Sequence, residues 1–97
     1  LIRFAENAPG ETWTGILDDI EKLQIPILVL HGLNDGWISP VEAVKIAKTA
    51  RNYADIVLFK GLGHSLSKVE SPLKDEGGTI EDEVIVSIVK WLRKNVE

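Results

Sequence analysis

Two short segments of uninterrupted apolar residues, with a helix-forming segment between them, constrain the fold of this chain most strongly. Residues 27–30 (ILVL) and 56–59 (IVLF) show no polar alternation, which is typical of strands covered on both faces, as in a parallel sheet. Ser39 can cap a helix that starts at Pro40, and Glu42 completes the pattern of a capping box. This order predicts a strand–helix–strand crossover with parallel strands, and therefore an α/β fold.

Helical patterns flank this unit on both sides. Residues 13–23 place apolar side chains three and four positions apart, and Pro26 closes that helix because it disfavours helical geometry in the residue before it. A last helix is expected to start at Thr79, with Asp82 three residues further on. The apolar face of this last helix is expected to consist of Val84, Ile85, Ile88, Val89, Leu92 and Val96.

The whole chain, residues 1–97, is expected to be a single partial domain. Residues 13–97 would contain the packed elements, and residues 1–12 would be irregular or derived from a cap. The loop at 61–78 is long enough to be functional or disordered. Two parallel strands make a narrow sheet with both edges open to further pairing. We therefore expect either self-association or neighbouring strands from outside this sequence. Because the chain begins at Leu1 and contains no methionine, its start is expected to be a cut.

Composition excludes several classes of function. The formal charge of −4, with 11 basic residues spread along the chain, argues against nucleic acid or an anionic membrane as a partner. There is no cysteine and there are only two histidines, so neither a thiolate metal site nor a multi-histidine site is expected. No apolar run is long enough to cross a bilayer and no signal peptide is recognisable, which predicts a cytoplasmic protein.

Two residues suited to proton transfer follow the two expected strands. Asp35 comes just after the first strand and His64 just after the second. In open α/β sheets, functional residues gather at the carboxyl ends of the strands. A carboxylate beside an imidazole can hold its tautomer and stabilise its protonated form, so the sequence predicts that these two side chains form a catalytic pair.

The segments IPILVLHGLNDGWISPVEA and DIVLFKGLGHS, taken in this order, resemble the C-terminal part of an α/β-hydrolase. In that family the acid follows a strand of the form P-x-L-x-x-x-G and precedes a D-x-x-[VI]-x-P step, which here runs from Asp35 to Pro40. The family histidine follows the last strand in a G-x-G-H turn, matched by residues 61–64. The resemblance implies a serine-type hydrolase of carboxylic esters or related acyl compounds, with Asp35 as the acid and His64 as the base. It implies no cofactor and no metal, a small-molecule ester or acyl substrate, and the remainder of the hydrolase domain as the partner.

The sequence departs from the family at the nucleophile. No complete G-x-S-x-G segment occurs, so the serine is expected to come from outside this chain, which alone should not turn over an ester. Ser65 lies in half of such an elbow, with Ser67 in place of the second glycine. A second alternative is that His31 and Gly32 mark the oxyanion loop of the first half of the fold. The helix after Pro40 favours the acid loop instead.

Simpler explanations exist for each of these residues. Asp35 could merely form a turn with Asn34, and His64 could be an ordinary surface histidine. Trp37 and Ile38 are candidates for lining a substrate pocket, although large apolar residues more often pack in a core. Packing or structural roles are the simplest expectation for His31, Trp13 and Trp91, and helix capping for the acidic residues 81–83.

Two rival hypotheses for the function remain open. The chain could be a non-catalytic α/β interaction module whose open strand edges pair between copies in an intertwined oligomer. Alternatively, the family could be right but the chemistry different, since its relatives include peptidases, thioesterases, epoxide hydrolases and dehalogenases. The identity of the missing nucleophile would separate these last possibilities.

Overall fold

The computed structural model describes residues 13–50 and 53–96, with side chains from residue 17 onward. The sequence-based expectations for residues 1–12, and for the side chains of Trp13 and Ile16, therefore lie outside the described residues. The elements are α1 (Trp13–Lys22), β1 (Ile27–Gly32), α2 (Pro40–Ala50), β2 (Ala54–Phe59), the short 3₁₀ turn η3 (Pro72–Lys74) and α3 (Asp82–Val96).

The two strands are parallel neighbours in a two-stranded sheet. Their register runs from Ile27 opposite Ala54 to Gly32 opposite Phe59, and α2 connects them. The predicted mixed α/β fold with a parallel strand–helix–strand unit is therefore confirmed. Each strand is two residues longer than its apolar segment, β1 at its carboxyl end and β2 at its amino end.

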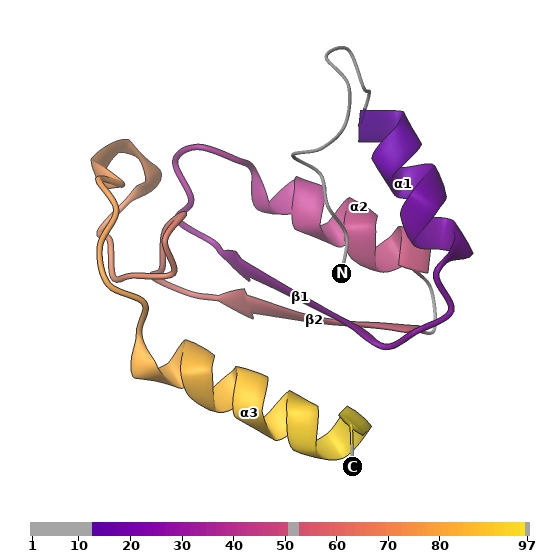
Figure 1. The fold of residues 1–97 in the computed structure, drawn as a ribbon. Helices are drawn as coiled ribbons and strands as arrows, with labels where there is room; N and C mark the ends of the chain where they lie inside the picture. Colours follow the sequence, from indigo (N-terminus) through magenta and orange to yellow (C-terminus); the bar gives the residue numbers. More distant parts are fainter. Residues whose placement is uncertain (1–12, 51–52, 97) are drawn as a thin grey trace.

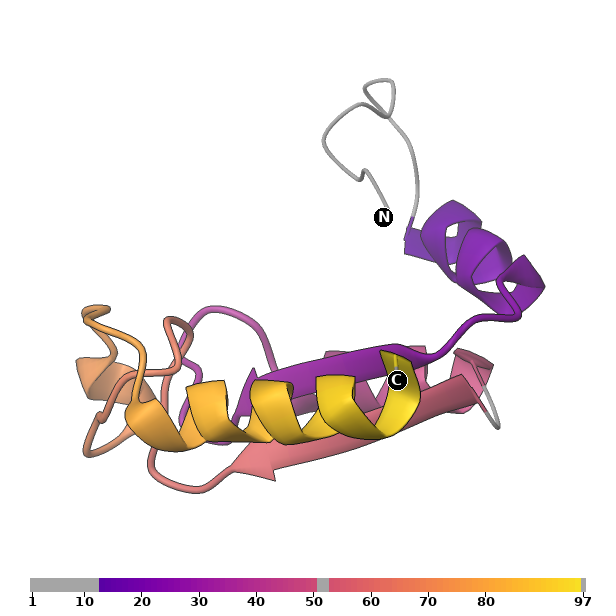
Figure 2. The same ribbon diagram turned by 60° about the horizontal axis from the view of Figure 1, so that its bottom comes forward.

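The helices lie on both faces of the sheet. In Figure 1 and Figure 2, α2 lies against one face, α3 lies across the other, and α1 packs on α2. The core lies between the sheet and the first half of α3, where Val84 is fully buried together with Phe59 and Leu62. Packed against these three are Leu30, Val57, Leu66 and Ile88.

The prediction that both strands are fully covered is wrong for β2. Ile56 is 37% exposed and Leu58 is 38% exposed, because one helix cannot cover that face out to the unpaired edge of β2. The expected apolar face of α3 is likewise only partly buried. Its exposed apolar members are Ile85, Val89, Leu92 and Val96. The apolar segments therefore identify the strands and the last helix correctly, but several of their apolar side chains are not buried within this chain.

The helix boundaries follow local hydrogen bonds. Ser39 caps α2 as predicted, with its Oγ accepting a hydrogen bond from the N–H of Val41 (3.2 Å). The start predicted for the last helix at Thr79 is wrong, since α3 begins at Asp82. The reason is that the N–H of Glu81 bonds to the carbonyl of Leu66 (3.0 Å), which ties the chain to the histidine loop until that residue.

Within the part of the chain that the structure describes, no helix is both long enough and apolar enough to span a bilayer.

Candidate active site

Both strands end on the same side of the molecule, and the two loops that follow them are joined by backbone hydrogen bonds. The N–H of Leu33 donates to the carbonyl of Phe59 (2.9 Å), and the N–H of Asn34 donates to that of Leu62 (2.8 Å). The Asn34 side chain donates to the carbonyl of Val69 (3.1 Å), a bond between the two loops. The loop that carries Asp35 is therefore held directly against the loop that carries His64.

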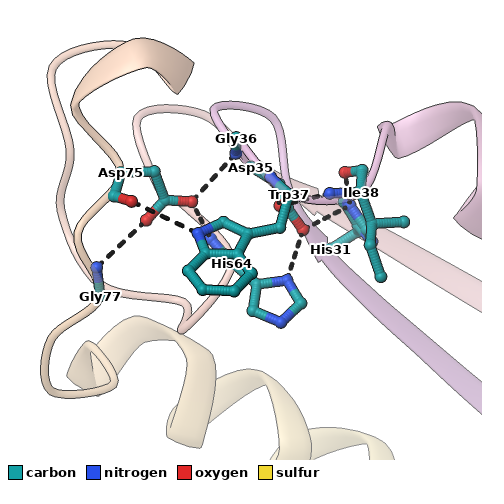
Figure 3. Close-up of polar contacts among 8 residues, drawn as sticks. All are labelled: His31, Asp35, Gly36, Trp37, Ile38, His64, Asp75 and Gly77. Atoms are coloured by element: carbon teal, nitrogen blue, oxygen red, sulfur yellow. Dashed lines mark hydrogen bonds and ion pairs between the residues drawn. The ribbon is translucent and has the colours of Figure 1, made fainter.

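The Asp35 carboxylate is the buried centre of the site, with three hydrogen bonds to its two oxygens and the ring of His31 beside it. Its Oδ1 accepts hydrogen bonds from the backbone N–H groups of Trp37 (2.8 Å) and Ile38 (2.9 Å). Its Oδ2 lies 3.0 Å from Nδ1 of His64 and 3.0 Å from Nε2 of His31 (Figure 3). An ionised carboxylate has about four acceptor positions, and hydrogen bonds occupy three of them here.

His64 combines one held nitrogen with one free nitrogen. With Asp35 ionised, Nδ1 carries the proton and donates a hydrogen bond to the carboxylate. Nε2 makes no hydrogen bond with any residue that the structure describes, and the side chain is 43% exposed. This leaves the tautomer with a lone pair at Nε2, which is the form that can accept a proton from a substrate or a nucleophile.

His31, by contrast, is held on the inside of the site. Its Nε2 lies 3.0 Å from the carbonyl oxygen of Ile38 as well as 3.0 Å from Asp35, and its side chain is only 14% exposed. Both neighbours are acceptors, so Nε2 is the protonated nitrogen and has no lone pair to offer. The hydrogen-bonded structural role expected for His31 agrees with this geometry.

Trp37 and Ile38, the candidates for a substrate pocket, point to different places. The indole of Trp37 is 72% exposed and stacks on the imidazole of His64, with ring centroids 5.5 Å apart and planes 18° apart. Ile38 lines an apolar hollow of about 170 Å³ between β1 and α2, together with Val29 and Ala43. Of these two side chains, that of Trp37 contacts the His64 ring, whereas Ile38 reaches the pair through its backbone N–H.

Asp75 is a site residue that the sequence did not indicate. Its Oδ2 accepts hydrogen bonds from the backbone N–H groups of His64 (2.7 Å) and Gly36 (3.0 Å). Its backbone carbonyl accepts a hydrogen bond from the Trp37 indole (3.3 Å). No sequence signal indicated this role. In the structure, a Cβ on Gly63 would lie 2.5 Å from Asp75 Oδ1, so a glycine there leaves room for the carboxylate.

Both carboxyl groups have lowered pKa values. Burial alone raises the pKa of Asp35, but the hydrogen bonds from Ile38, Trp37 and His64 outweigh it, so that the pKa lies below the usual 3.8. For Asp75, the hydrogen bonds from the N–H groups of Gly36 and His64 lower the pKa. Both groups are therefore ionised at neutral pH.

These shifts predict how stability depends on pH. Because each folded-state pKa lies below the unfolded value, each carboxylate contributes stability that is present above pH 3.8 and is lost as the pH falls through the folded-state pKa. We expect the urea midpoint to fall as the pH drops below about 4. Asp35→Asn should flatten this fall, whereas Glu76→Gln, at an exposed neighbouring carboxylate, should not. An equal slope in wild type and Asp35→Asn would contradict the assignment.

The two alternatives to this site lack the geometry they need. Residues 64–70 form turns and bends, so no helix follows Ser65 as a nucleophile elbow requires, and it is Leu66 that has a positive φ of 58°. An oxyanion loop after His31 would need free backbone donors. The N–H groups of Leu33, Asn34 and Asp35 are all hydrogen-bonded to backbone carbonyls.

No cofactor or metal site emerges from the residues described. Among residues 13–50 and 53–96, no three His, Asp or Glu side chains are arranged to hold a metal ion. The acidic residues Asp82 and Glu83 lie in the first turn of α3, where they favour the positive end of the helix.

Comparison with known proteins assigns no family to this chain, so the argument for its function depends on the geometry of the site. The chain matches no protein-family model, and no curated protein matches it.

Proposed function

We propose that residues 13–97 form the C-terminal part of an α/β-hydrolase domain that cleaves carboxylic esters or related acyl compounds. Asp35 is the acid and His64 is the base, and the nucleophilic serine is supplied from outside this chain. The observation that carries the proposal is the Asp35–His64 pair, 3.0 Å apart at the carboxyl ends of adjacent parallel strands, with Nε2 of His64 open. A buried acid with three hydrogen bonds behind a half-exposed histidine suits proton transfer better than a purely structural role.

The mechanism follows from the two nitrogens of His64. Nε2 removes the proton of the serine hydroxyl as the oxygen attacks the acyl carbon, and the ring becomes an imidazolium. The charge of Asp35 at Nδ1 stabilises this cation without itself being protonated. Nε2 then gives the proton to the leaving alcohol. A water molecule then attacks the acyl carbon while Nε2 removes its proton. Nε2 returns this proton to the serine oxygen as the acid is released. No step requires a metal or an organic cofactor.

The exposed apolar side chains of the sheet and of α3 support the proposal that further strands and helices complete the domain. Ile56, Leu58 and the exposed apolar side chains of α3 lie on faces that additional strands and helices would cover. Trp37 is the residue best placed to contact the substrate, because its indole lies beside the reacting imidazole. Ile38 is a weaker candidate, since it faces the hollow between β1 and α2. Peptide and thioester substrates stay open within the same acyl-transfer chemistry.

The histidines provide a matched test. His64→Gln and His31→Gln are introduced at the native locus, and the protein is isolated with an antibody against residues 82–96, so that any chain attached to it is recovered. Hydrolysis of p-nitrophenyl butyrate should fall at least about 10³-fold in His64→Gln, because the base is lost. The fall in His31→Gln should be much smaller, because His31 only helps to hold Asp35. Equal effects, or an unchanged rate in His64→Gln, would overturn the proposal.

A second candidate function is an interaction module without catalysis. The observation in its favour is the open edge of β1, which borders the apolar hollow between β1 and α2. Pairing of this edge between two copies would give a continuous sheet. It predicts a dimer by light scattering, in place of a 10.7 kDa monomer, and normal function in Asp35→Asn and His64→Ala.

A further inference from the structure

One carboxylate outside the Asp35–His64 pair joins the three segments that build the site. The Asp75 Oδ2 atom accepts the backbone N–H of His64 at 2.7 Å and that of Gly36 at 3.0 Å (Figure 3). These two N–H groups belong to residues 28 positions apart, one in each loop. The other oxygen, Oδ1, accepts the N–H of Gly77 at 3.4 Å, which steadies the carboxylate from its own loop.

The surroundings of Asp75 are shaped around this contact. A Cβ on Gly63 would lie 2.5–2.7 Å from the carboxyl atoms of Asp75. A Cβ on Gly36 would lie 2.1 Å from the carbonyl oxygen of Pro72, in the turn that precedes Asp75. Real Cβ atoms do not approach so closely, so Gly36 allows the backbone at Pro72 to reach its loop, and Gly63 leaves room for the Asp75 carboxylate. Residues 72–75 therefore pack closely against the loops that carry Asp35 and His64.

The two aspartates divide the task of placing His64. Asp35 holds the ring through Nδ1, while Asp75 holds the backbone of the same residue through its N–H. Asp75 also holds Trp37, whose indole donates to its carbonyl oxygen and stacks on the His64 ring. Hydrogen bonds to an ionised acceptor are stronger than neutral ones, which suits an exposed position where a neutral amide would compete poorly with water.

We propose that Asp75 is a positioning residue that aligns the His64 imidazole between Asp35 and Trp37. The position of the His64 ring between Asp35 and Trp37 is a property of this chain alone. Its catalytic consequence rests on the proposed function. In the assembled hydrolase, Asp75→Ala should lower kcat by about 100-fold and change KM less than about twofold. The reason is that a small displacement of the His64 imidazole slows the chemical step and leaves substrate binding almost unchanged.

The geometry is tested by NMR on the 97-residue chain, with no enzyme assay. During an acid titration, the amide protons of Gly36 and His64 should shift together with one midpoint below pH 3.8. The amides of Trp37 and Ile38 should instead report the separate titration of Asp35, to which they are hydrogen-bonded. In Asp75→Asn the Gly36 and His64 shifts should disappear while those of Trp37 and Ile38 persist. Glu76→Gln should leave all four unchanged.

A second readout measures the position of the ring. In Asp75→Ala the far-downfield Nδ1 proton signal of His64 should broaden or vanish, and the Trp37–His64 cross-peaks should weaken by at least half. Asp75→Asn, which keeps one acceptor oxygen but not the charge, should restore part of both. The proposal is overturned if Asp75→Ala keeps wild-type signals, or if the Gly36 and His64 amides do not titrate together. If Asp75→Ala does not fold, the titration of wild type against Asp75→Asn decides alone. A failure of hydrolase activity would leave these signals unaffected, so the two proposals fail separately.

Discussion

Asp35→Asn is expected to lower kcat of the proposed hydrolase by about 10⁴-fold while the fold is kept. An asparagine can still present an oxygen to the N–H groups of Trp37 and Ile38, which now bond to Oδ1. Its NH₂ group then faces Nδ1 of His64 and favours the opposite tautomer, in which Nε2 carries the proton and cannot act as a base. The charge that stabilises the imidazolium is lost as well.

The control for this prediction is Asp55→Asn. Asp55 lies in β2 near the end of the sheet away from the site, and its carboxylate also accepts a hydrogen bond from a ring N–H, that of Trp91 (2.9 Å). Its replacement should change kcat less than about twofold, because it removes a charge of the same kind without touching His64. Turnover of p-nitrophenyl butyrate measures kcat, and an amide spectrum verifies the fold. A loss below tenfold in Asp35→Asn, or a similar loss in both variants, would contradict the assigned role of Asp35.

Gly32→Ala is expected to have the largest effect on stability, roughly 3 kcal/mol or more. Gly32 is buried at the end of β1, and a Cβ there would lie 2.3 Å from the carbonyl oxygen of Leu62 and 2.4 Å from that of Gly63. Both obstacles are backbone atoms and cannot rotate away. The added methyl group must push the histidine loop off the strand and weaken the hydrogen bond between Asn34 and Leu62.

The matched variant is Gly61→Ala in the same loop. Gly61 has a φ of +78° and open space around its Cα, so an alanine meets only the conformational cost of the left-handed region, about 1–2 kcal/mol. Urea unfolding followed by circular dichroism gives both values. If Gly32→Ala is no more destabilising than Gly61→Ala, the close approach of the two loops at Gly32 is wrong.

The parts of the fold that follow from local chemistry could be predicted from the sequence. The apolar segments and the Ser39–Pro40 start gave the order and parallel pairing of the strands, because these depend on neighbours along the chain. The meeting of Asp35 and His64 follows from the same topology, since the carboxyl ends of neighbouring parallel strands share one edge of the sheet.

What escaped prediction depends on contacts between distant segments. α3 begins at Asp82 and not at Thr79 because Glu81 is bound to Leu66, a contact that no helix signal reveals. Asp75 appears in the sequence as an ordinary acidic residue of a polar loop, and only its position against Gly36 and Gly63 gives it a role. The exposure of Ile56 and Leu58 likewise follows from how many elements are present to cover them.

The central claim is that Asp35 and His64 serve a serine that lies outside these 97 residues. It is tested most directly by treating the protein, isolated with the antibody against residues 82–96, with a fluorophosphonate probe and locating the label by mass spectrometry. The account predicts label on a serine in a G-x-S-x-G segment that lies beyond this sequence, with labelling abolished in His64→Gln. Label on Ser65, or the absence of label from every chain recovered with residues 82–96, would contradict it.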